Sequence, residues 1–280
     1  MAARPSTGTN SRSRSGRKLA LVTGASSGLG AAFARAYAAR GLDVALVARR
    51  APRLEALAAE LVDRHAIEAI VIPADLASAD AHEAVMAAVG ARGRHVDVLV
   101  NNAGFGIAQS FAAVPWSRQR EFLMTMVVTP CALARAVIPG MVERGGGAII
   151  NVSSLAAFSP GVAGHSLYPG AKSLLLKFSQ ALDAEYRAKG LKVTAVCPGS
   201  TESEFGQVAG TDQVMRKDRW RLAQTAEAVV ETAIRANDAG RLVVVPGLFN
   251  KAAAVLMQAL PESIVRAIIA RGSAKYHLGD

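Results

Sequence analysis

A tyrosine and a lysine four residues apart are the side chains of this sequence best suited to moving a proton. Tyr168 and Lys172 enclose Pro-Gly-Ala, and in a helix that begins near residue 168 the i,i+4 spacing places both over one face. A phenol has an unperturbed pKa of about 10, and a nearby ammonium lowers that value by favouring the phenolate. Such a pair can exchange a proton with a substrate oxygen near neutral pH. The spacing alone is weak evidence, because many helices carry it by chance.

A serine at the end of a buried strand is the second candidate. The apolar run 148–152 predicts a strand, and Ser153 and Ser154 follow it, fourteen residues before Tyr168 in the case of Ser154. Either hydroxyl could donate a hydrogen bond to a substrate carbonyl, and the register favours Ser154. The alternative is that both serines merely end the strand.

A glycine-rich turn between a strand and a helix predicts a phosphate site. The apolar run 19–22 leads into Thr-Gly-Ala-Ser-Ser-Gly-Leu-Gly at 23–30. Glycines let the backbone turn and approach a pyrophosphate, and the N-terminus of the helix supplies N–H groups and positive potential. The residues expected to contact a dinucleotide here are Gly24, Ser26, Ser27, Gly28, Leu29 and Gly30.

Together these motifs resemble the short-chain dehydrogenase/reductase family. Four features occur in the family's order: Thr-Gly-x-x-x-Gly-x-Gly at 23–30, Asn-Asn-Ala-Gly at 101–104, the strand-end Ser154, and Tyr-x-x-x-Lys at 168–172. The resemblance spans about residues 18–247. It implies an oxidoreductase that interconverts a carbonyl and an alcohol. Tyr168 would be the general acid or base, Lys172 would lower its pKa and hold the nicotinamide ribose, and Ser154 would orient the substrate carbonyl.

The resemblance also implies further cofactor contacts. Asp75 would lie along the adenine, although it could equally be only a helix cap. The turn after the fourth strand would form the cofactor floor, and a Pro-Gly segment after the sixth would cover the nicotinamide, with a hydroxyl at Thr201 or Ser203 bonding its carboxamide. These residues are Asn102, Ala103, Gly104, Pro198, Gly199, Thr201 and Ser203.

The end of the second predicted strand favours NADP(H) over NAD(H). In dinucleotide folds an acidic residue at this place binds the ribose 2′-hydroxyl, whereas arginine accommodates a 2′-phosphate. The strand ends in Ala48-Arg49-Arg50, with no acid. Arg49 is the expected phosphate ligand, with Arg50 and Arg53 as helpers. The alternative is a solvated basic start of the next helix.

The middle of the 116–143 helix departs from the family pattern. The family has an Asn about 25 residues after the first Asn of Asn-Asn-Ala-Gly, and counting from Asn101 gives Met126. In the family, the main-chain carbonyl of this residue is thought to hold a water of the proton relay. Pro130 lacks an N–H, so the carbonyl four residues earlier loses its helical partner. We therefore expect a broken helix near 126–130 and an active enzyme, although Pro130 could serve packing alone.

Alternating strands and helices predict the fold. Strands are expected near 18–23, 42–48, 68–73, 96–101, 147–153, 191–197 and 241–245, and helices near 28–40, 51–64, 78–91, 116–143, 166–189 and 224–237. This order is typical of an α/β fold: a Rossmann-type, doubly wound parallel sheet of about seven strands in a three-layer α/β/α sandwich. We expect a disordered basic tail at 1–17, one catalytic domain at 18–247, and a C-terminal helical extension at 248–280 packed on it.

The composition of the chain bears on which classes of partner it is expected to bind. The net charge is +10, but five basic residues lie in the first 18 positions, which contain no acid, so a solvated tail explains the excess better than nucleic-acid binding. The longest apolar stretches are too short for a membrane span. Cys131 and Cys197 suggest no disulfide framework, and the five histidines show no metal-ligand spacing. A cytoplasmic protein without a metal is expected.

The C-terminal region and the substrate leave alternatives open. Ile264, Val265, Ile268 and Ile269 form an apolar stripe that could pack on the core or on a second subunit of a homodimer or homotetramer. A substrate lid or contact with a membrane surface is the other option. The substrate is expected to be a small, apolar carbonyl or alcohol. The rival functions are a catalytically silent NADP-binding sensor or scaffold, and a sugar-nucleotide epimerase.

Overall fold

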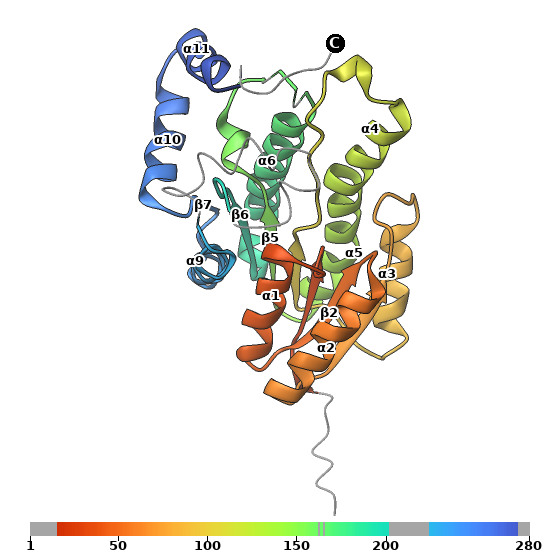
Figure 1. Cartoon of the computed structure of the whole chain (residues 1–280). Helices are drawn as coiled ribbons and strands as arrows, with labels where there is room; N and C mark the ends of the chain where they lie inside the picture. The colour runs from red at the N-terminus through yellow and green to blue at the C-terminus, as the bar shows by residue number, and fades with distance from the viewer. Residues whose placement is uncertain (1–15, 162, 165, 202–223, 274–280) are drawn as a thin grey trace, which may run out of the picture.

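A parallel sheet of seven strands forms the centre of the molecule, as seen in a computed structural model that describes residues 16–161, 163–164, 166–201 and 224–273 (Figure 1). The strand order is β3-β2-β1-β4-β5-β6-β7, and every neighbouring pair is parallel. The strands are β1 (Leu19–Thr23), β2 (Asp43–Ala48), β3 (Ala69–Pro73), β4 (Val98–Asn101), β5 (Gly147–Val152), β6 (Leu191–Val196) and β7 (Val243–Val244).

Helices cover both faces of the sheet. The first face carries α1 (Gly28–Ala39), α2 (Ala51–His65) and α9 (Ala226–Asp238). The second carries α3 (Ala81–Gly90), α5 (Thr129–Glu143) and α6 (Tyr168–Tyr186). Side chains alternate along each strand, so Leu19 and Leu21 pack on the second face while Ala20 and Val22 pack on the first. The predicted three-layer Rossmann-type fold is confirmed.

The strand order creates a crevice between β1 and β4. From β1 the chain proceeds outward to β2 and β3, then returns to pair β4 with the other side of β1. The strand order therefore reverses direction at β1 and β4, and open α/β sheets bind ligands at the carboxyl edge of the sheet at such a point.

The helix expected over 116–143 contains a π-helical turn. It consists of α4 (Trp116–Leu123), the π-turn η3 (Met124–Val128) and α5. The N–H of Thr129 donates to the carbonyl of Met124, five residues back, and Pro130 follows in the first turn of α5. Because proline has no N–H, the regular hydrogen-bond ladder cannot continue through it. The helix is not broken as expected, however: it continues from Trp116 to Glu143, and the irregularity near Pro130 is a single π-turn within it.

Among the described residues, a single helical run has the length and apolar composition that a membrane span requires. Residues Trp116–Glu143 are long and apolar enough to cross a bilayer by length and composition, and 44% of the most apolar window is buried inside the protein. Leu133, Val137 and Met141 of this run belong to the core on the second face of the sheet. Its apolar character is thus accounted for by packing, and it is weak evidence for a membrane span.

Two helices follow β7 within the region expected to form a C-terminal helical extension: α10 (Leu248–Ala259) and α11 (Glu262–Ser273). They lie together at the upper end of the molecule in Figure 1, on the side of β7. Of the expected apolar stripe, Val265 is buried, whereas Ile264 and Ile268 are about half exposed at 46% and 57%. The outer face of α10 is also apolar, with Phe249 and Leu256 exposed.

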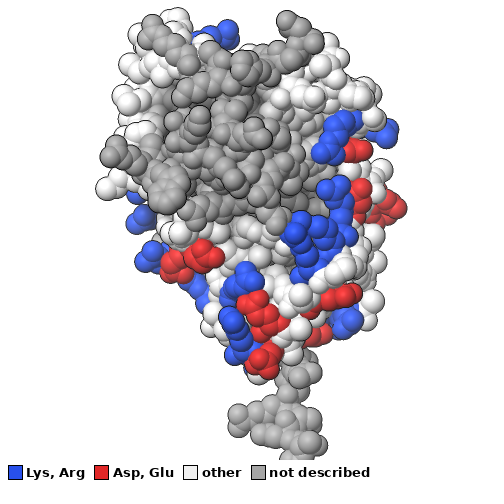
Figure 2. Space-filling model, in the orientation of Figure 1, with Lys and Arg blue, Asp and Glu red and all other residues white. Residues whose placement is uncertain are grey.

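Charged side chains of both signs are mixed over the described part of the face shown in Figure 2. Several are paired, among them Arg35 with Glu60 and Arg40 with Asp238, each at 2.8 Å. The basic excess of the composition therefore forms no single continuous band among the described residues of that face.

A buried ion cluster joins the starts of the strands at the edge opposite the crevice. Nη1 of Arg94 lies 2.8 Å from Oδ2 of Asp43 and 2.7 Å from Oε2 of Glu68, and Nη2 donates to the carbonyl of Arg17. Oδ1 of Asp43 accepts from the N–H of Glu68 at 2.7 Å. The carboxylate of Asp43 is 1% exposed, so it depends on these partners in place of water.

Replacing Arg94 by leucine should therefore destabilise the fold. The change leaves the buried carboxylate of Asp43 without its cation, and breaking such a pair costs about 3 kcal/mol or more. Arg92→Leu is the matched control, because Arg92 is 59% exposed and lies 3.7 Å from Glu68; it should cost less than about 1 kcal/mol. Urea denaturation measures both, and equal losses would contradict the assignment.

Candidate active site

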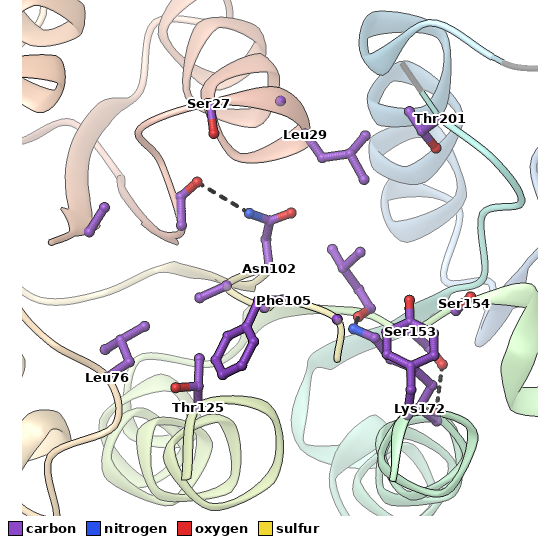
Figure 3. A pocket seen from close by; sticks show the side chains of 18 of the residues that line it. Ser27, Leu29, Leu76, Asn102, Phe105, Thr125, Ser153, Ser154, Lys172 and Thr201 are labelled. Carbon is purple, nitrogen blue, oxygen red and sulfur yellow. Dashed lines mark hydrogen bonds between the residues drawn. The ribbon is translucent and has the colours of Figure 1, made fainter. Parts of the chain in front are cut away.

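The crevice contains a cavity of about 600 Å³ at the carboxyl edge of the sheet. This volume lies within the range of cofactor and ligand sites. In Figure 3, Leu29 of α1 and Ser27, just before α1, lie at one side of the cavity. Leu76, Phe105 and Thr125 lie at a second side, and Ser153, Ser154 and Lys172 at a third. The cavity is thus long enough to bring the glycine turn and the Tyr-Lys pair into one space.

The glycine turn is shaped by close approach of backbone to backbone. Gly24 and Gly28 adopt positive φ angles of 67° and 53°, a region that other residues rarely occupy. A Cβ on Gly24 would lie 2.9 Å from Cα of Ala103 and 2.8 Å from Nδ2 of Asn102. Gly30 lies beneath the turn, where a Cβ would collide with the carbonyl of Gly24, so it supports the cavity wall without forming part of it.

Hydrogen bonds join this turn to the turn after β4. Oγ1 of Thr23 donates to the carbonyl of Val100 at 3.1 Å and accepts from the N–H groups of Asn102 and Ala103 at 2.9 and 3.1 Å. Nδ2 of Asn102 donates to the carbonyl of Thr23 at 2.9 Å. Asn101, buried below, donates to Asn151 and to the carbonyl of Pro130. The floor of the cavity is consequently held by side chains of both asparagines.

Arg50 lies across the mouth of the glycine turn. Its Nη2 donates to the hydroxyl oxygens of Ser26 at 2.9 Å and Ser27 at 3.0 Å, and its Nε lies 3.2 Å from Ser26. Arg49, the expected principal ligand, lines the same cavity. The structure therefore brings Arg50, expected only as a helper, directly onto the predicted phosphate turn.

Ser154 faces the phenol of Tyr168, while Ser153 faces away. The hydroxyl of Ser154 hydrogen-bonds to Tyr168 and accepts from the N–H of Ala156 at 3.1 Å. Ser153 is 2% exposed and its Oγ donates to the main-chain carbonyl of Lys172 at 2.7 Å. Neighbouring residues leave a strand in opposite directions, which separates the two hydroxyls.

Lys172 is buried beneath Tyr168. Its ammonium donates to the carbonyl of Val152 at 2.8 Å and lies 5.7 Å from the centre of the Tyr168 ring. Burial lowers the pKa of Lys172 to about 8, because removing the ammonium from water disfavours the charged form, and the nearby Cys197 opposes this shift slightly. The amine can therefore change charge close to physiological pH.

The phenol does not show the expected lowering of its pKa. Burial raises the pKa of Tyr168, and the hydrogen bond from Ser154 partly opposes the increase. The physical reason is that removal from water penalises the phenolate. Burial also disfavours the charged form of Lys172, whose Nζ donates to the carbonyl of Val152. In the protein alone, the phenol is thus held in its protonated form.

Met126 fills the space where the family pattern has an asparagine. Its side chain is fully buried and packs with Phe105 and Phe122, and a Cβ on Gly104 would meet its sulfur. The methionine therefore contributes an apolar wall beneath the turn after β4, and any polar role at this position falls to the main chain of the π-turn.

The remaining predicted residues mostly line the cavity. Asp75 does so, but it does not cap the following helix as the alternative expected: the N-cap of α3 is Asp80, and the carboxylate of Asp75 accepts from the N–H of Ala77 at 3.1 Å in the turn before it. Ser203 lies outside the described residues. The sequence provided no signal for several further wall residues: Phe105, Glu121, Thr125 and Leu155. Within the described part of the chain, no group of His, Cys, Asp and Glu is suited to a metal ion.

Comparisons with known proteins agree with this geometry. The family model for short chain dehydrogenase matches residues 18–214. An uncharacterized oxidoreductase of Myxococcus xanthus (strain DK1622) is 39% identical over 188 residues, which cover 67% of this chain and 74% of that protein. The very-long-chain 3-oxoacyl-CoA reductase of Anas platyrhynchos is 34% identical over 195 residues, covering 68% of this chain but only 62% of the reductase.

A solved structure extends the similarity to the whole fold. The short-chain dehydrogenase from Sphingobium yanoikuyae, determined in complex with NADPH, is 32% identical with a TM-score of 0.74. The superposition covers 88% of this chain and 97% of that one. The chain therefore belongs to the short-chain dehydrogenase/reductase family of oxidoreductases, which act on alcohol and carbonyl groups.

Proposed function

We propose that this protein is an NADP(H)-dependent oxidoreductase that interconverts a carbonyl and an alcohol, with Tyr168 as its general acid and base. One observation carries the proposal: the hydroxyl of Ser154, the phenol of Tyr168 and the ammonium of Lys172 meet at the end of a cavity whose other end is the glycine turn. Proton donor and phosphate site thus share one space.

The cavity fits a dinucleotide. At one end, the positive-φ glycines and the N-terminus of α1 would hold the pyrophosphate. Beside them Arg50, with Ser26 and Ser27 already in contact and Arg49 nearby, would hold a 2′-phosphate, which favours NADP(H). At the other end, the segment from Pro198 to Thr201 lines the cavity and would cover the nicotinamide.

The chain's own groups account for the proton chemistry. The bound nicotinamide supplies or accepts the hydride. Ser154 would donate to the substrate oxygen and orient it, and Tyr168, protonated because of burial, would donate a proton to that oxygen during reduction. Lys172 stabilises the phenolate that remains, since its buried charge acts in a medium of low dielectric. In oxidation the same groups act in reverse.

We also propose a class of substrate, a location and an oligomeric state. A small, apolar substrate, a cytoplasmic location and a homo-oligomer are consistent with the sequence. The silent sensor rests only on Met126, and an intact Ser154, Tyr168 and Lys172 arrangement weighs against it. Oxidation of NADPH in the presence of a panel of ketones and aldehydes tests the catalytic function, and binding of NADPH without any turnover would favour the sensor.

Tyr168→Phe removes the hydroxyl and keeps the ring. The turnover rate should fall by about 10²-fold or more, the usual contribution of a positioned proton donor. NADPH affinity should be largely kept, because the phenyl ring still packs in place. Steady-state kinetics and fluorescence titration with NADPH measure the two effects. Near-normal turnover by this variant would refute the assignment of the acid.

Arg50→Ala should lower the affinity for NADPH much more than the affinity for NADH. A charge-assisted hydrogen bond contributes about 1.5–3 kcal/mol, or roughly 10- to 100-fold in affinity, and only NADPH has the 2′-phosphate. Arg49→Ala, which changes a neighbouring arginine of the same cavity, should have the smaller effect. Dissociation constants for both cofactors measure this, and an equal loss for NADPH and NADH would exclude Arg50 as the phosphate ligand.

The buried Lys172 should make stability depend on pH. Its pKa is about 8 in the folded protein and 10.5 in the reference state, so the unfolded chain binds more protons between these values and stability rises with pH there. The gain is up to about 3 kcal/mol, at about 1.4 kcal/mol per pH unit. Chemical denaturation from pH 7 to 10.5 should show this rise relative to Lys172→Met. A constant difference between the two proteins would mean that the ammonium is solvated.

A further inference from the structure

The C-terminal helix α10 reaches the cavity through one buried side chain. Asn250, in the first turn of α10, is 6% exposed and lies against the main chain of Gly199. The same helix packs on the short turn η4 (Leu155–Phe158), whose Leu155 lines the cavity. A helix far along the chain is thus in direct contact with two segments of the site.

Gly199 is a glycine because of this neighbour. Its φ is not in the left-handed region, so the backbone alone would accept a side chain. A Cβ at this position would lie 2.8 Å from both Cγ and Nδ2 of Asn250, and closer still to Oδ1. Real Cβ atoms do not approach other heavy atoms so closely, so the carboxamide occupies the place of the missing side chain.

The carboxamide cannot easily move aside. Nδ2 of Asn250 donates to the carbonyl of Pro246 at 2.9 Å, which ties the side chain to the turn before α10. That turn contains Gly247 at a φ of 83°, and the amide of Gln224 lies beside both residues. Moving the carboxamide aside would break the hydrogen bond to Pro246 and leave a buried polar group unpaired, which costs free energy.

We propose that Asn250 is a positioning residue for the cofactor: its carboxamide sets the position of the Pro198–Gly199 turn, and thereby the nicotinamide end of the cavity. The proposal rests on the proposed function, because it takes the cavity to hold a nicotinamide cofactor. Asn250 does not line the cavity and acts only through Gly199. It also lies beyond residues 18–214, the part matched by the family model.

A double-mutant cycle on the full chain tests the contact. Gly199→Ala inserts the colliding methyl group and should weaken NADPH at least about fivefold, since about 1 kcal/mol corresponds to a fivefold change. Asn250→Ala removes the wall and should weaken NADPH about two- to fivefold. In the double variant the space left by the Asn250 carboxamide accommodates the methyl group. Adding Gly199→Ala to Asn250→Ala should therefore cause no further loss of NADPH affinity. The same factor in both backgrounds would overturn the proposal.

The two cofactors separate this role from phosphate binding. The turn covers the nicotinamide end, which NADPH and NADH share, so each variant should lower the affinity for both cofactors by the same factor. The KM for the cofactor should change more than kcat. A loss confined to NADPH would contradict the inference. If the unmodified chain binds neither cofactor, the proposed function fails with it, whereas normal binding with strictly additive variants removes the inference alone.

Gln258→Ala is the matched control on the same helix. Like Asn250, Gln258 donates to a carbonyl four residues earlier, that of Ala254 at 2.9 Å, but it lies about two turns further along α10, and the three atoms nearest to a Cβ at Gly199 all belong to Asn250. This variant should leave both cofactor affinities unchanged. If Gly199→Ala does not fold, recovery of a cooperative thermal transition in the double variant is the expected result. Failure to recover it, with unchanged affinity in Asn250→Ala, would refute the proposal.

Discussion

The cofactor end of the molecule depends on one close contact between two backbone turns. After β1 the chain turns at Gly24, and after β4 it turns at Asn102, and the two turns are so close that Nδ2 of Asn102 donates to the carbonyl of Thr23. Thr23 joins them through a hydroxyl that both donates and accepts. Any Cβ at Gly24 or Gly30 would separate the turns and close the space in front of α1. The glycines are therefore required by the tertiary contact as much as by the phosphate.

The other end of the cavity depends on the burial of a cation beneath a phenol. Burial brings the pKa of Lys172 close to neutrality and keeps Tyr168 protonated, while Ser154 counteracts part of the second effect. Each group alone would be costly to bury. When Tyr168 loses its proton during the reaction, the buried ammonium of Lys172 stabilises the phenolate. The burial that costs free energy in the resting protein therefore strengthens this interaction during catalysis.

The order of elements could be predicted because it follows from local patterns. Apolar runs of five or six residues, separated by amphipathic helices, are enough to specify a parallel sheet with helices on both faces. Pro130 also indicated an irregularity near Met126, since a missing N–H is a local property. The sequence could not show that the irregularity is a π-turn within a continuous helix, because that depends on how the flanking helices pack.

The kinds of groups in the site and their order along the chain could be read from local motifs: the glycine turn, the serine, the tyrosine and the lysine. Tertiary structure alone decided which of two neighbouring serines faces Tyr168, which of two neighbouring arginines reaches Ser26, and that Asn250 lies against Gly199. The physical reason is that adjacent residues leave the chain in different directions and that contacts between distant segments leave no periodic trace in the sequence. Burial, which raises the pKa of Tyr168 where its neighbour Lys172 was expected to lower it, is likewise a property of the assembled fold.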